Sequence, residues 1–228
     1  MSKSILLSIK PNWCAKIMNG EKTIEIRKNK ALATAIQKLI NENGYADIYV
    51  YCSKDDYNHL HQLADHSTDE TLGYSTTYYK VENTRGWKIA PYPLNGKVAF
   101  KFRCYKVEEI KNLGSYFLTW SLNCDELLKN SCLNWEELFD YLRKPLNRGS
   151  GVLGYAIHIS DLEIVNEELY EFKIYCDKLS SIWAGKCDRC RRLHIDYEGY
   201  LNRCDRKLRK APQNFVYIEI EQNEKNNI

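Results

Sequence analysis

The alternation of apolar and polar positions predicts a chain built from short strands with a few helices between them. Compact apolar or period-two segments, which are typical of strands, occupy residues 5–10, 22–27, 47–52, 97–106, 155–165 and 215–220. Apolar positions spaced three to four residues apart, as on one face of a helix, occupy residues 13–18, 31–42 and 124–143. Strands interrupted by short helices favour an α+β barrel over a repeated βαβ array.

The expected helix ends carry residues that usually cap helices. Asn12 is expected to cap the first helix, and the Asn–Gly pair at 19–20 ends it. A second Asn–Gly pair at 43–44 ends the next helix. Cys124 and Asn134 each begin a stretch that resembles a capped helix start, so two helices are expected between residues 124 and 143.

The 228 residues are expected to form a single domain, 1–228, because one core commonly reaches this size. Residues 53–95 show no clean period, and we expect a long excursion over the barrel mouth there. The second irregular segment is a cysteine-rich, basic insertion at 176–210. No stretch approaches the ~18–20 apolar residues that span a bilayer, so the expected localisation is cytoplasmic, without membrane association.

Three charged residues, Lys22, Glu25 and Arg27, cluster at the start of the second expected strand. Strand alternation turns Ile24 and Ile26 to one side and places Glu25 and Arg27 together on the other. One interpretation is a surface ion pair worth ~0–1 kcal/mol. The other is a polar pocket in which Arg27 either binds phosphate or fixes Glu25, while a Lys22 of lowered pKa acts as acid or base.

A second group of polar residues lies on the expected strand at 155–165. Period two places His158 and Ser160 on one face and Tyr155 and Ile157 on the other. A histidine in a strand is either a packing residue or, where it faces a pocket, a group that titrates near neutral pH.

The segment at 8–27, SIKPNWCAKIMNGEKTIEIR, ends in a Gly-x-Lys-x-x-Glu-x-Arg motif, and it resembles the signature of ASCH-domain proteins. The resemblance continues through residues 155–162 and 211–219, which look like later strands of ASCH proteins found in phages and prophages. It implies a PUA-like mixed β-barrel with short flanking helices, related to RNA-binding modules. It also implies a pocket for RNA or a modified nucleotide, with ligand-binding residues Lys22, Glu25, Arg27, Tyr155 and His158.

One branch of ASCH-like proteins is an amidohydrolase that acts on acetylated cytidine, using the motif lysine and a threonine three residues later. Here Lys22 matches the lysine, but Glu25 stands at the threonine position, and strand alternation turns Thr23 away. The resemblance therefore leaves an N-acylated nucleoside hydrolase, with Lys22 and Glu25 as catalytic residues, as an alternative to binding alone. A further alternative is a phage regulator that binds a protein partner through residues 53–95.

Four cysteines gather in the insertion at 176–210. Cys187-x2-Cys190 followed by Cys204 has the spacing of a zinc knuckle, and either Cys176 or His194 supplies the fourth ligand. Such a closed site is structural, since metal binding supplies the folding energy that a small polar loop lacks. The alternative is a set of free or redox-active thiols.

The same insertion concentrates positive charge. Residues 183–211 hold nine Lys or Arg against four Asp or Glu, a local net charge of +5, while the whole chain carries +3. Cations that follow the phosphate backbone, with Trp183, Tyr197 and Tyr200 stacking on bases, fit single-stranded RNA; the alternative is a solvated loop. The nucleic-acid-binding candidates are Arg189, Arg191, Arg192, Arg203, Arg206 and Lys207.

Overall fold

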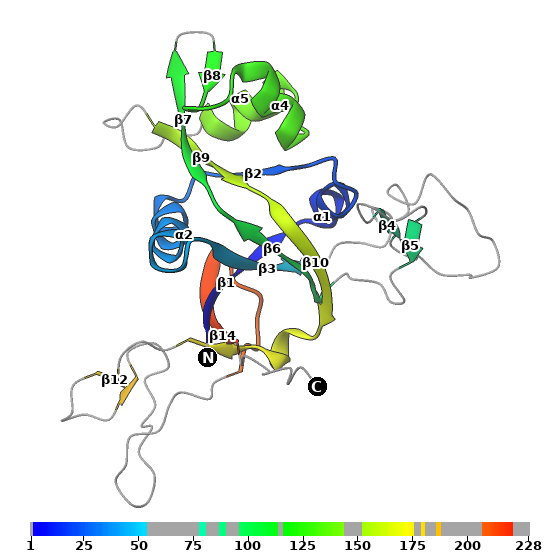
Figure 1. Ribbon diagram of the computed structural model, residues 1–228, viewed down its shortest axis with the longest axis vertical. Coiled ribbons are helices and arrows are strands. Elements are labelled where there is room, and N and C mark those ends of the chain that lie inside the picture. Colours follow the sequence, from blue (N-terminus) through cyan, green and yellow to red (C-terminus); the bar gives the residue numbers. More distant parts are fainter. Residues whose placement is uncertain are drawn as a thin grey trace, which may run out of the picture.

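A computed structural model describes the chain over most of its length. The described residues are 2–53, 78–80, 87–89, 96–113, 116–143, 152–175, 179–180, 186–187 and 207–220. In this part of the chain, four α-helices accompany a six-stranded and a four-stranded sheet (Figure 1). The prediction of an α+β fold is confirmed.

The six-stranded sheet has the order β10-β6-β3-β1-β14-β11. β1 pairs in parallel with β3 and antiparallel with β14, so the first and last long strands of the described chain lie side by side. The predicted strands at 5–10, 47–52, 97–106 and 215–220 all belong to this sheet. Its strands are β1 (Ser2–Ile9), β3 (Ala46–Cys52), β6 (Val98–Cys104), β10 (Ser160–Glu167), β11 (Lys173–Ile174) and β14 (Phe215–Ile220).

The four-stranded sheet has the order β2-β9-β7-β8 and carries the charged motif on its edge strand β2. Its strands are β2 (Ile24–Arg27), β7 (Val107–Leu113), β8 (Tyr116–Leu118) and β9 (Val152–His158). Two further pairs of short strands are β4 (Tyr78–Lys80) with β5 (Trp87–Ile89), and β12 (Leu179–Ser180) with β13 (Lys186–Cys187). β4 and β5 lie within the stretch 53–95 that is expected to be an excursion, and residues 54–77, 81–86 and 90–95 of that stretch lie outside the described part.

The single strand expected at 155–165 is two strands in two different sheets. β9 ends at His158 and β10 begins at Ser160, so the chain passes from one sheet to the other at Ile159 (Figure 1). Asp161, directly after this transition, has a φ of +47°. Hydrophobic pattern alone gives no boundary here, because both strands are partly buried and the change of sheet is a tertiary event.

The helices are α1 (Pro11–Met18), α2 (Lys30–Asn43), α4 (Cys124–Ser131) and α5 (Trp135–Arg143), and a short 3-10 helix, η1, covers Leu169–Glu171. Asn29 caps α2 by accepting hydrogen bonds from two backbone amides, and Gly44 ends that helix with a φ of +84°. The two predicted starts in 124–143 are confirmed, since α4 and α5 form separately. The expected cap at Asn12 is wrong: Lys10 stands at the cap position without a side-chain bond, and Pro11 opens the helix.

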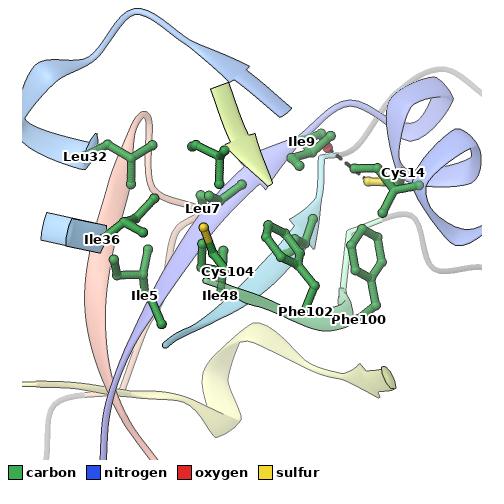
Figure 2. Packing of buried hydrophobic residues seen from close by; sticks show 14 of the residues in the cluster. Ile5, Leu7, Ile9, Cys14, Leu32, Ile36, Ile48, Phe100, Phe102 and Cys104 are labelled. Atoms are coloured by element: carbon green, nitrogen blue, oxygen red, sulfur yellow. Dashed lines mark hydrogen bonds between the residues drawn. The ribbon is translucent and has the colours of Figure 1, made fainter. Parts of the chain in front are cut away.

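The largest group of buried hydrophobic residues lies between the six-stranded sheet and helices α1 and α2 (Figure 2). Ile5 and Leu7 of β1, Ile48 of β3 and Phe100 and Phe102 of β6 are fully buried there. Cys14 of α1 packs at one end of this group, beside Ile9. The end of β1 and the start of α1, where the motif segment begins, are therefore held in fixed positions by the core.

A smaller hydrophobic group fixes β2 against α4 and α5. Ile24 and Ile26 pack with Leu127 of α4 and with Leu138 and Leu142 of α5. The strand therefore turns its isoleucines toward this helix pair. Among the described residues, no helix has both the length and the apolar character needed to cross a membrane.

Candidate functional site

A pocket of about 520 Å³ opens between α1, β2 and α5. Its volume falls within the range of about 300–1,000 Å³ that is usual for small-molecule sites. The three predicted motif residues, Lys22, Glu25 and Arg27, all line it. The complete lining is Ser8, Ile9, Lys10, Trp13, Lys22, Glu25, Ile26, Arg27, Leu133, Glu137, Asp140 and Tyr141.

Lys22 precedes β2 and is only 3% exposed. Its Nζ donates a hydrogen bond of 2.8 Å to the carbonyl of Ser131, the last residue of α4, and lies 3.4 Å from Glu25 Oε2. The same Nζ lies 5.0 Å from the centre of the Trp13 ring. Burial lowers the pKa of Lys22, Arg27 acts in the same direction, and the attraction of Glu25 opposes both without cancelling them.

Glu25 lies between two cations. Arg27 Nε is 2.8 Å from Glu25 Oε1, and Lys22 Nζ approaches the other carboxylate oxygen. Arg27 also donates from Nη2 to the carbonyl of Ser8 at 2.7 Å. Of the two roles open to Arg27 from sequence, the geometry matches the one in which it fixes Glu25.

The guanidinium of Arg27 retains unused donor capacity. Its Nε is buried, yet the contact with Glu25 has ion-pair distance without hydrogen-bond alignment, and Nε finds no other acceptor among the described residues. Buried donors are almost always satisfied by protein, water or ligand. Glu25 Oε1, 2.8 Å away, is the acceptor within reach of this buried nitrogen.

The lining carries no net formal charge, and two of its residues are aromatic. Lys10, Lys22 and Arg27 are matched in number by three acidic residues, Glu25, Glu137 and Asp140. Trp13 comes from α1 and Tyr141 from α5, and Tyr141 is 40% exposed. The pocket thus offers ring faces for stacking and paired charges for hydrogen bonding, with little surplus positive charge.

Tyr155 and His158, the other two predicted ligand residues, do not line this pocket. Tyr155 pairs with Arg27 in the β2–β9 ladder and is 9% exposed. His158 pairs with Ile24, so it shares the face opposite Glu25 and Arg27. The structure therefore brings together Lys22, Glu25 and Arg27, and places the histidine elsewhere.

His158 belongs to a separate polar cluster centred on Glu108 of β7, a residue that the sequence interpretation did not single out. His158 Nε2 lies 2.7 Å from Glu108 Oε2, and Ser121 donates to the same carboxylate from its backbone amide and its hydroxyl at 2.9 and 2.7 Å. Lys106 Nζ is 3.3 Å from the other oxygen. Burial alone raises the pKa of Glu108, but the hydrogen bonds from Ser121, His158 and Lys106 outweigh it and lower that pKa.

Most of the predicted zinc and RNA sites fall outside the described residues. Cys176, Cys190, Cys204 and His194 lie there, as do Arg189, Arg191, Arg192, Arg203 and Arg206. Cys187 is described only as backbone, within β13. Lys207 is exposed, with Nζ 3.9 Å from Glu171 Oε2. In the described part of the chain, no group of three or more His, Cys, Asp or Glu side chains is arranged to hold a metal ion.

Three of the pocket residues that the sequence interpretation missed come from α5. Glu137, Asp140 and Tyr141 are more than a hundred residues from the motif along the chain, so no local pattern relates them to it. The periodicity that predicts α5 also leaves these residues on its polar side, where they resemble ordinary surface positions. The other missed residues lie mostly within the motif segment at 8–27, where the aromatic Trp13 was an available signal.

No protein-family model matches this chain, and no curated protein matches it either.

Proposed function

We propose that the chain binds a nucleobase, in RNA or as a modified nucleoside, in the pocket around Lys22 and Glu25. One observation carries the proposal: a cationic donor and an anionic acceptor stand 3.4 Å apart in a pocket that Trp13 and Tyr141 also line. Nucleobases present donors beside acceptors along their edges, and their faces stack on aromatic side chains. The similarity of residues 8–27 to ASCH domains supports the same ligand class, and the mixed α+β architecture is compatible with the PUA-like barrel that we propose with it.

The neutral charge balance of the lining supports the base, and not the phosphate, as the group inside the pocket. Lys22 and Arg27 share the carboxylate of Glu25, and the three cations of the lining are matched by three carboxylates in total. Phosphate binding requires cations with charge to spare. In our proposal the phosphates of an RNA lie outside the pocket, along the basic segment at 183–211.

Calorimetric titration of the purified chain tests this proposal. Cytidine, N4-acetylcytidine and a short single-stranded RNA are each titrated at low and high salt. We expect nucleoside affinity to be almost independent of salt, RNA affinity to fall steeply with salt, and Lys22→Ala to abolish nucleoside binding. Lys16→Ala is the matched control, because Lys16 Nζ also lies 5.0 Å from the Trp13 ring but the residue does not line the pocket. Failure of all three ligands to bind would overturn the proposal.

A second candidate function is hydrolysis of an N-acylated nucleoside, and the lowered pKa of Lys22 favours it. An amine of lowered pKa beside a carboxylate can take a proton from water as the water attacks an acyl carbon. Thr23, the nearest hydroxyl along the motif, is exposed, so water is the nucleophile in this scheme. Release of acetate from N4-acetylcytidine, lost in Lys22→Ala, would establish the activity; binding without release would exclude it.

A further inference from the structure

Lys22 combines three properties that distinguish nucleophilic lysines from structural ones. Its amine is buried, it lines a cavity large enough for a small molecule, and a carboxylate oxygen stands 3.4 Å from it. An ordinary surface lysine has none of these, and its amine stays protonated and unreactive at neutral pH. Desolvated lysines beside another cation are a recurrent source of imine chemistry.

We propose that Lys22 is a nucleophile that forms an imine with an aldehyde on the bound molecule, so that the pocket captures formyl-bearing nucleosides covalently and reversibly. The nucleoside part of this inference rests on the proposed function. The aldehyde part rests on the amine and its surroundings alone.

The protonation state of the Lys22 amine depends on the groups that surround it. Burial disfavours the ammonium form of Lys22 and lowers its pKa, which raises the fraction of free amine at neutral pH. Glu25 is the group that would restore the charge, but Arg27 also occupies that carboxylate at 2.8 Å. Of the remaining contacts, the Ser131 carbonyl accepts one N–H, and the Trp13 ring faces the same nitrogen.

The chemistry balances without a metal, an oxidant or a reductant. Glu25 Oε2, 3.4 Å away, takes a proton from the ammonium group. The free amine then adds to the aldehyde carbon, forming a carbon–nitrogen bond and a carbinolamine. Glu25, now protonated, gives its proton to the carbinolamine hydroxyl, which leaves as water. The product is the protonated imine, which keeps the one remaining N–H and the positive charge. Addition of water reverses the sequence and releases the aldehyde unchanged.

Reductive trapping tests this inference on the intact 228-residue chain. The protein is incubated with 5-formylcytidine and sodium cyanoborohydride, and the product is analysed by intact mass and peptide mapping. We expect one adduct per chain, equal to the nucleoside mass less one oxygen atom, on the peptide that contains Lys22. Labelling of Lys22 should be faster than that of Lys16, because Lys22 lines the pocket that holds the aldehyde and Lys16 does not.

Variants separate reactivity from folding. Lys22→Arg keeps the positive charge and Lys22→Met keeps the unbranched chain, and both should lose the adduct while retaining a cooperative thermal transition. Lys16→Arg should leave the adduct unchanged. An adduct distributed over exposed lysines, or one that persists in a folded Lys22→Arg protein, would overturn the inference.

Competition distinguishes this inference from the proposed function. Excess cytidine should slow trapping if nucleosides occupy the pocket. Trapping at Lys22 that cytidine does not slow would support the reactive amine and contradict nucleoside binding. Cytidine binding in calorimetry with no adduct would contradict the reactive amine and leave nucleoside binding standing.

Discussion

Two carboxylates, Glu25 and Glu108, are buried, and the groups that stabilise their negative charge differ. Glu25 is compensated by two full positive charges, Lys22 and Arg27. Glu108 is compensated mainly by hydrogen bonds, from Ser121 and His158, with one exposed lysine nearby. The first arrangement depends on charge and the second on hydrogen-bond geometry, so neutralising each carboxylate should have a different consequence.

Removal of the charge on Glu25 should be strongly destabilising. Glu25→Gln leaves Lys22, 3% exposed, without its compensating charge, and breaking a buried ion pair costs about 3–5 kcal/mol. Urea unfolding near neutral pH measures the change in unfolding free energy. Glu163→Gln is the matched control: Glu163 pairs with Lys101 at 2.8 Å but is 65% exposed, and such pairs contribute less than about 1 kcal/mol. Equal losses in the two variants would contradict the argument.

Glu108 should make the fold sensitive to acid. Because its pKa is lowered from the ordinary 4.5, the ionised carboxylate stabilises the folded state above that pH, and this stability is lost as pH falls below it. Unfolding free energies at about pH 6 and about pH 3.5 should therefore differ less in Glu108→Gln than in the wild type. Glu109→Gln, at a 52%-exposed neighbouring carboxylate, should keep the wild-type difference. A Glu108 variant with an unchanged acid response would refute this role.

At the scale of elements, α4 and α5 join the pocket to the four-stranded sheet. At the C-terminal end of α4, the Ser131 carbonyl accepts a hydrogen bond from Lys22 Nζ. The Asn130 carbonyl accepts one from the Thr23 backbone amide at 2.9 Å. α5 follows after three residues and contributes Glu137, Asp140 and Tyr141 to the lining. The position of the pocket wall therefore depends on how well these short helices are formed.

Capping of α5 is testable at a single residue. Asn134 accepts a hydrogen bond from the Glu137 amide at 2.8 Å, and Glu137 accepts one from the Asn134 amide at 2.9 Å. Asn134→Ala should lower the unfolding free energy by about 1 kcal/mol, whereas Asn134→Asp, which keeps the acceptor, should lose little. Urea unfolding of the two variants measures the difference. If both variants lose the same amount, the cap does not stabilise the helix.

Sequence pattern predicted those elements whose signals are local. The Asn–Gly stop of α2, the capped starts of α4 and α5, and the opposite faces of Ile24 and Glu25 all follow from neighbouring residues. The passage from β9 to β10 at Ile159 and the approach of α5 to β2 do not, because they depend on long-range pairing. Gly154 shows the same limit: a Cβ there would lie 2.8 Å from Leu142 and 3.2 Å from the Arg27 carbonyl, a constraint that sequence alone does not reveal.

At the scale of the whole molecule, the six-stranded and four-stranded sheets are packed against hydrophobic cores. The zinc site at Cys187, Cys190 and Cys204, with Cys176 or His194 as the fourth ligand, stays a prediction from spacing. Three thiolates and a fourth ligand would bind Zn²⁺ tetrahedrally and stabilise the polar insertion around them. Elemental analysis of chain purified without chelator should then find about one zinc per chain.

The zinc prediction can be tested with cysteine variants, by comparing their metal content, RNA binding and nucleoside binding. Cys190→Ser should lose the zinc and, through it, the steep salt dependence of RNA binding, because the basic side chains would no longer be held in one surface. Nucleoside binding in the pocket should persist, since Lys22 and Glu25 are positioned by β2 and α4. Cys124→Ser, at a partly buried free cysteine outside the cluster, should keep metal and RNA binding alike. If the Cys190→Ser chain binds RNA as the wild type does, RNA binding by the basic segment does not depend on a metal.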